Sequence, residues 1–161
     1  MKALVRYFFT PPTPGTGSIF WIRLAVGLIF FTQGILKFTD PKMGVLRFTR
    51  IGFPHPLFTA HFVGVFEIVC GALVLAGWMT RWAVIPLLIV ISTAIATTKI
   101  PELFRPMQGF WFMVSDARAD FAMFCSLLFL LLAGPGTFSL DQRRAGADHA
   151  ASRPAAPVPG E

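Results

Sequence analysis

The chain has 161 residues, of which 55% are hydrophobic and 14% are charged, with a formal net charge of +6. Soluble domains carry about 25% charged residues, so this deficit and a mean hydropathy of +0.66 favour one small polytopic membrane domain. The lysines and arginines are too scattered for a groove that follows nucleic-acid phosphates, which excludes nucleic acid as a partner. We assign the positive charge to contact with anionic lipid of the bilayer.

The first half of the chain contains two apolar segments. A basic lead with Pro and Gly, residues 1–17, precedes an apolar run that shows no A-x-A-like cleavage site, so a retained span is predicted over 18–38 rather than a signal peptide. A basic loop follows at 39–56. The second span is predicted over 57–78, because Pro56 suits the first turn of a helix.

The second half contains two further spans. They are predicted over 82–98 and 114–133, separated by an aromatic, proline-broken stretch at 99–113 that is typical of the membrane interface. Segments of this length can cross a hydrocarbon layer of about 30 Å, and short connections make neighbouring helices antiparallel. The fold class is therefore all-α: an antiparallel bundle of four transmembrane helices over 18–140, followed by a disordered tail at 141–161.

Glu67 lies near the middle of the second predicted span. An ionisable residue at the bilayer centre costs about 2.5–3.5 kcal/mol on insertion scales and usually faces protein or water. The fold therefore has to supply a partner for this carboxylate.

Small and ionisable residues share one face of each span on a helical wheel of about 100° per residue. Because small residues let helices approach and polar side chains then meet across the contact, we expect these faces to point inward. The faces comprise Arg23, Gly27, Gly34 and Lys37, with Gln33 at the edge; His61, Gly64, Glu67 and Gly71; Ser92, Ala96 and Lys99; and Asp116 with Asp120.

Depth in the membrane groups these residues further, since a helix rises about 1.5 Å per residue and successive spans alternate in direction. Glu67 then has two possible partners: Arg23 on the terminal side, and the level of His61 and Gln33 on the loop side. The predicted polar pocket consists of Glu67, His61, Arg23, Gln33 and Lys37. A secondary group near the loop boundary consists of Lys99, Asp116, Arg118 and Asp120.

Two interpretations of this pocket remain open. In the functional one, it holds a polar headgroup or relays protons. In the structural one, the ion pair only keeps the helices in register, His61 is a hydrogen-bonded core residue, and Lys37 and Lys99 reach toward the lipid headgroups.

Absent motifs narrow the chemistry. One histidine, His61, lies clearly within a span, which disfavours bis-histidine haem ligation. The sequence has no HExxH, GxSxG or phosphate-loop motif, and Cys70 and Cys125 form no CxxC pair. We expect neither a metal site nor a covalently bound cofactor.

Three segments resemble the motifs of the DoxX family over about residues 18–142. They are RLAVGLIFFTQGILKF in the first span, Pro56 and Glu67-x-x-x-Gly71 leading to Gly77 and Thr80-Arg81, and the closing LLLAGPGTFSLDQ. The resemblance implies a bacterial inner-membrane protein of four helices. It also implies that Arg23, Gly34, Lys37, Glu67, Gly71 and Arg81 are the counterparts of the family's motif residues.

Family relatives include the small quinone-reducing membrane subunit of thiosulfate oxidation and proteins linked to oxidative-stress complexes. The resemblance therefore implies an accessory subunit of a redox system, with a quinone as ligand and a soluble or membrane oxidoreductase as partner. A scaffold without chemistry and a small-solute permease acting as a homo-oligomer are the alternatives. Arg81 in a tight turn and Arg143-Arg144 beyond the last span place both termini in the cytoplasm.

Overall fold

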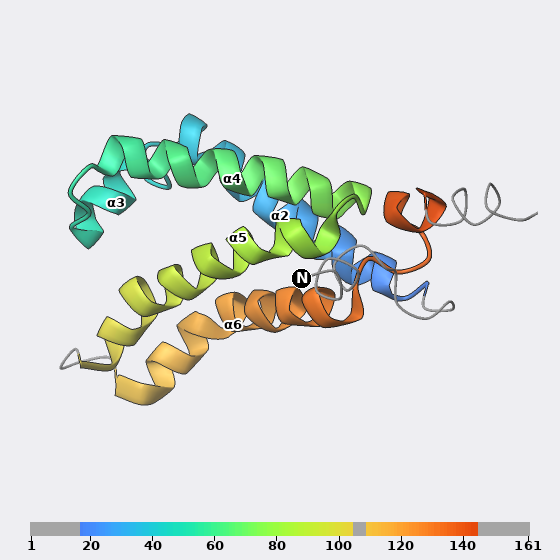
Figure 1. The fold of residues 1–161 in the computed structure, drawn as a ribbon. Helices are drawn as coiled ribbons and strands as arrows, with labels where there is room; N and C mark the ends of the chain where they lie inside the picture. Colours follow the sequence, from blue (N-terminus) through green and yellow to red (C-terminus); the bar gives the residue numbers. More distant parts are fainter. Residues whose placement is uncertain (1–16, 105–108, 145–161) are drawn as a thin grey trace, which may run out of the picture.

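The computed structural model describes residues 17–104 and 109–144, and predictions for the N-terminal lead, for 105–108 and for the tail from 145 onward lie outside these residues. The described elements are all helical (Figure 1). They are α2 Ile19–Thr39, α3 Val45–Ile51, α4 Pro56–Ala76, α5 Thr80–Ala94, the π-helix η1 Ile95–Lys99, the 3-10 helix η2 Ile100–Phe104 and α6 Gly109–Ala133.

Among the described residues, three helical segments are long and apolar enough to cross a membrane: α2, α4, and the continuous run from Thr80 to Phe104 that α5, η1 and η2 form. The fourth, α6, has 25 residues but carries Asp116, Arg118 and Asp120 in its first half. Many large apolar side chains on these helices face outward, which suits a surface in contact with lipid. The predicted fold class, an all-α polytopic membrane protein, is confirmed.

The long helices form two antiparallel pairs, α2 with α4 and α5 with α6 (Figure 1). The pairs meet where α4 turns into α5 and diverge toward the end that carries α3. The buried apolar core fills mainly the end at which the pairs meet. Its most deeply buried side chains are Val26, Val74, Val84, Leu87, Leu127 and Leu130.

Glycines bring α2 and α4 into backbone contact. A Cβ atom added at Gly71 would lie 2.7 Å from the backbone nitrogen of Phe31 and 3.0 Å from the carbonyl oxygen of Gly27. One added at Gly34 would lie 2.8 Å from the carbonyl oxygen of Gly64. The predicted inward faces of the first two spans are therefore the faces that meet, because only glycine fits this separation.

The predicted inward face of the third span is wrong for Ser92 and Ala96 but not for Lys99, which reaches Asp116 and Asp120 of α6. Ser92 and Ala96 are exposed, and the buried stripe of α5 runs instead through Leu87 and Ile91. The prediction placed Ser92, Ala96 and Lys99 on one face by assuming a regular helix of about 100° per residue. The π-helical turn Ile95–Lys99 has wider i→i+5 bonding, so Lys99 points in a different direction from Ser92 than a wheel of about 100° per residue gives.

The turn that follows α6 is fastened to the start of α2. The guanidinium of Arg23 donates hydrogen bonds to the carbonyl oxygens of Pro135, at 2.7 Å, and of Phe138. Gly77 packs against this group with φ +67°, and a Cβ there would lie 2.5 Å from Nη1 of Arg23. We call this arrangement of Arg23, Gly77 and residues 135–138 the terminal clamp.

Asp141 extends the terminal clamp to α5. Its carboxylate accepts hydrogen bonds from the backbone N–H groups of Met79, at 2.9 Å, and Thr80, at 3.3 Å, and so caps the first turn of that helix. Its own N–H donates to the carbonyl of Gly77 at 3.1 Å. The two helix pairs are thus joined firmly at one end, which leaves the opposite end free to diverge.

Candidate functional site

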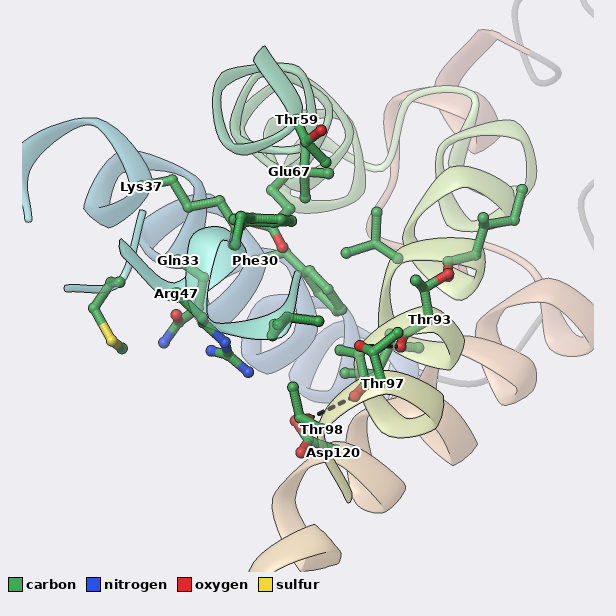
Figure 2. Close-up of a pocket in the computed structure, with 18 of the residues that line it drawn as sticks. Phe30, Gln33, Lys37, Arg47, Thr59, Glu67, Thr93, Thr97, Thr98 and Asp120 are labelled. Atoms are coloured by element: carbon green, nitrogen blue, oxygen red, sulfur yellow. Dashed lines mark hydrogen bonds and ion pairs between the residues drawn. The ribbon is translucent and has the colours of Figure 1, made fainter. Parts of the chain in front are cut away.

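A cavity of about 440 Å³ lies between the two helix pairs where they diverge (Figure 2). It receives side chains from α2, α3, α4, α5, η1 and α6. Most are apolar, among them Phe30, Phe48, Val63, Ile91 and Met123. This volume lies in the range of about 300–1,000 Å³ that is usual for small-molecule sites, which are mostly apolar with a few placed polar groups.

Lys37 and Glu67 form an ion pair on the α2–α4 side of the cavity. Their side chains are 11% and 5% exposed, so the pair is buried within the protein. Glu67 lies one turn from both Gly64 and Gly71, and Lys37 lies one turn from Gly34. The glycine contact between the helices therefore fixes the separation across which the ammonium meets the carboxylate.

Gln33 of α2 and Arg47 of α3 line the cavity on the same side as Lys37 (Figure 2). Within residues 17–104 and 109–144, neither side chain has a hydrogen-bond partner. The Lys37 ammonium uses one of its three N–H donors on Glu67. We call Gln33, Lys37 and Arg47 the donor wall, because each has N–H groups that a ligand can use.

The opposite side of the cavity is formed by Thr93, Thr97, Thr98 and Asp120, from α5, η1 and α6 (Figure 2). The three hydroxyl groups donate to the carbonyl oxygens four residues earlier, at 2.8, 2.7 and 2.6 Å respectively. Asp120 lies 3.6 Å from the ammonium of Lys99. We call these four residues the acceptor wall.

The structure brings together only part of the predicted pocket. Lys37, not Arg23, is the ion-pair partner of Glu67, because the terminal clamp holds Arg23 at the far end of α2. His61 stacks on Phe38, with ring centroids 4.9 Å apart, and lines a separate apolar depression on the outer face of α4. Gln33, Lys37 and Glu67 do share the cavity.

The structure also divides the predicted secondary group, because only one of its four residues lines the cavity found among the described residues. Asp120 lines the cavity, whereas Lys99 reaches across to α6 and forms ion pairs with Asp116 and Asp120. Arg118 is exposed and donates to Ser115, both to its carbonyl oxygen at 2.6 Å and to its hydroxyl at 3.1 Å. It takes no part in the cavity lining found among the described residues.

The residues that sequence reasoning missed are Arg47 and the threonines of the acceptor wall. The one-turn spacing of Thr93 and Thr97 was an available signal. For Arg47 there was none, because its position depends on how the short helix α3 folds back against α4.

Comparison with known proteins identifies the family. The DoxX family model matches residues 18–100, more than half of the chain. The chain is 49% identical over 134 residues to "Uncharacterized membrane protein Rv3486" of Mycobacterium tuberculosis strain H37Rv, an alignment covering 80% of this chain and 82% of the relative. It is 28% identical over 120 residues to "Putative oxidoreductase CatD" of Bacillus subtilis, covering 74% and 81%. No solved structure matches. The chain belongs to the DoxX family of membrane proteins.

Proposed function

We propose that this protein is the membrane subunit of a redox system and that its cavity binds the headgroup of a quinone. The observation that carries the proposal is a buried Lys37–Glu67 ion pair on the wall of an otherwise largely apolar cavity. Quinone carbonyls accept hydrogen bonds, which Lys37, Gln33 and Arg47 can donate. The name of the Bacillus relative, an oxidoreductase, points to the same class of chemistry.

Access from the bilayer supports a lipid-soluble ligand. Phe62 of α4 and Ile89 of α5 both line the cavity and are exposed at the protein surface. They give the cavity an exposed apolar edge on α4 and α5, which suits entry from the lipid side. A headgroup carried on an isoprenoid tail can enter by this route while its tail stays in lipid.

Reduction of a quinone takes up two electrons and two protons. We propose that the electrons come from a partner oxidoreductase, because the sequence of this chain carries no redox motif. Lys37 positions the headgroup by hydrogen bonding, and Glu67, whose charge Lys37 compensates, is placed to pass a proton. The protein would lie in the bacterial inner membrane with both termini in the cytoplasm.

Binding of a short-tailed benzoquinone to the protein in lipid nanodiscs tests the proposal. We expect Lys37→Met to weaken binding at least about tenfold, since it removes a charge-assisted hydrogen bond to the ligand. We expect Glu67→Gln to weaken binding as well, because it removes the carboxylate that holds the Lys37 ammonium at the cavity wall. His61→Gln is the matched control, because His61 is another polar residue of α4 but lies outside the cavity. The proposal fails if the wild-type protein binds no quinone, or if Glu67→Gln supports quinone-linked electron transfer as well as the wild type.

A scaffold function is the second candidate. Lys37 and Glu67 connect α2 to α4 beside the glycine contact, so the pair also has the position of a register lock. This alternative expects Glu67→Gln to lower the abundance of folded protein while the folded fraction keeps its interaction with partners. The two candidates therefore differ in what the surviving folded protein does.

A further inference from the structure

We infer that the acceptor wall makes the cavity selective for the reduced, hydroxyl-bearing form of its ring ligand, the quinol, over the oxidised quinone. This inference rests on the proposed function. It concerns Thr93, Thr97, Thr98 and Asp120, which stand opposite the Lys37–Glu67 pair (Figure 2).

The side chains of the acceptor wall can accept hydrogen bonds from a ligand but do not donate them. A threonine hydroxyl has one hydrogen and two lone pairs, and Thr93, Thr97 and Thr98 each commit that hydrogen to a backbone carbonyl. Their oxygens can then only accept. The carboxylate of Asp120 also offers acceptor oxygens, and it lies 3.6 Å from the Lys99 ammonium.

The π-helical turn supplies two of the four residues of this wall. The turn of Ile95–Lys99 carries Thr97 and Thr98, and both line the cavity. Such turns occur frequently at functional sites. The same turn directs Lys99 to α6, where it binds Asp116 and Asp120, and the cavity lining within the described residues does not include it.

The two walls together discriminate between the two forms of the ring. A quinone has only acceptor oxygens, so it can satisfy the donor wall but faces lone pairs on the acceptor wall. A quinol can donate one O–H to Asp120 or a threonine oxygen, while its other oxygen still accepts from Lys37 or Arg47. An unmatched pair of acceptors weakens binding, and we expect a preference of about tenfold for the quinol, which is the ratio that one net hydrogen bond gives.

A preference of this kind acts on the direction of electron flow. Tighter binding of the reduced form raises the reduction potential of the bound couple, by about 30 mV for each tenfold in a two-electron couple. The acceptor wall would therefore favour transfer of electrons from the partner enzyme to the quinone bound in the cavity.

The test measures two dissociation constants anaerobically in nanodiscs, for a short-tailed benzoquinone and for the same compound reduced to its quinol. We expect the wild type to bind the quinol about tenfold more tightly. Asp120→Asn supplies an N–H donor, and Thr97→Val with Thr98→Val removes two acceptors, so both variants should move the ratio toward one. Asp116→Asn, which alters the other partner of Lys99 outside the cavity lining, should leave the ratio unchanged.

Each result has a distinct meaning. Equal affinity for the two forms in the wild type overturns the inference and leaves the proposed quinone site standing. A preference for the quinol that Asp120→Asn and the threonine variants leave unchanged also overturns it, because the preference then arises elsewhere. Absence of binding by either form contradicts the proposed function itself.

Discussion

Breaking the ion pair in the cavity wall should cost far more stability than breaking the second one. Lys37 and Glu67 are 11% and 5% exposed, so Glu67→Gln leaves a buried ammonium without a counter-charge. Removing one partner of such a pair costs about 3–5 kcal/mol. Asp116 is 44% exposed, and loss of an exposed pair costs about 0–1 kcal/mol. Asp116→Asn is therefore the matched control for Glu67→Gln.

A double variant distinguishes the cost of burying one unpaired charge from the cost of losing the whole ion pair. Replacing a buried ion pair by apolar side chains of similar size is often neutral or stabilising, so Lys37→Met with Glu67→Leu should recover most of the stability that Glu67→Gln loses. It should not recover quinone binding, because both polar groups are gone. The assay is the free energy of unfolding by SDS titration in mixed micelles, measured beside quinone affinity.

Two outcomes would refute this reasoning. If Glu67→Gln and Asp116→Asn destabilise the protein equally, the pair in the cavity wall is not buried in the manner described. If the double variant regains both stability and quinone binding, the pair acts only as a register lock and takes no part in binding the quinone.

Three further predictions concern the frame around the cavity and use the same unfolding assay. Gly71→Leu should destabilise the protein by about 1–3 kcal/mol or more, because the leucine side chain would meet the backbone of Phe31. Ala72→Leu, at the exposed neighbouring position, should have little effect, and equal effects of the two variants would contradict the glycine contact. Asp141→Ala should cost about 1 kcal/mol through loss of the cap on α5, and an unchanged stability would show that the cap contributes nothing. Arg23→Met should release the turn after α6 and make it more sensitive to limited proteolysis without changing quinone affinity; unchanged cleavage would argue against the terminal clamp.

The contact between the first two spans was predictable from the sequence because its signal is local. Glycines spaced along one face of each helix, with ionisable residues among them, identify the faces that approach each other, and the structure confirms this for Gly34 against Gly64 and for Gly27 against Gly71. Such a pattern needs only a regular helix, which both α2 and α4 provide.

The partner of Glu67 was not predictable in the same way. Arg23 and Lys37 lie on the same face of α2, so a helical wheel makes both of them possible ion-pair partners for Glu67 of α4. The choice is made by the turn after α6, more than one hundred residues along the chain, which occupies the Arg23 guanidinium. A distant tertiary contact of this kind leaves no mark on the local periodicity.

The far wall of the cavity was missed because its geometry is irregular. The wheel assumes one constant angle per residue, and the π-helical turn breaks that assumption between Ser92 and Lys99. Arg47 was missed for a related reason, since the short helix α3 owes its place to packing against α4 rather than to an apolar pattern of its own.

The most direct test of the central claim is photoaffinity labelling of the protein in nanodiscs with a short-tailed azidoquinone, followed by peptide mapping. A quinone bound in the cavity predicts labels on residues 29–37 of α2 and 89–98 of α5 and η1, reduced by excess unlabelled quinone. Labels confined to the outer apolar depression around Phe58 and Phe66, or labels that excess quinone leaves unchanged, would contradict a quinone site between the two helix pairs.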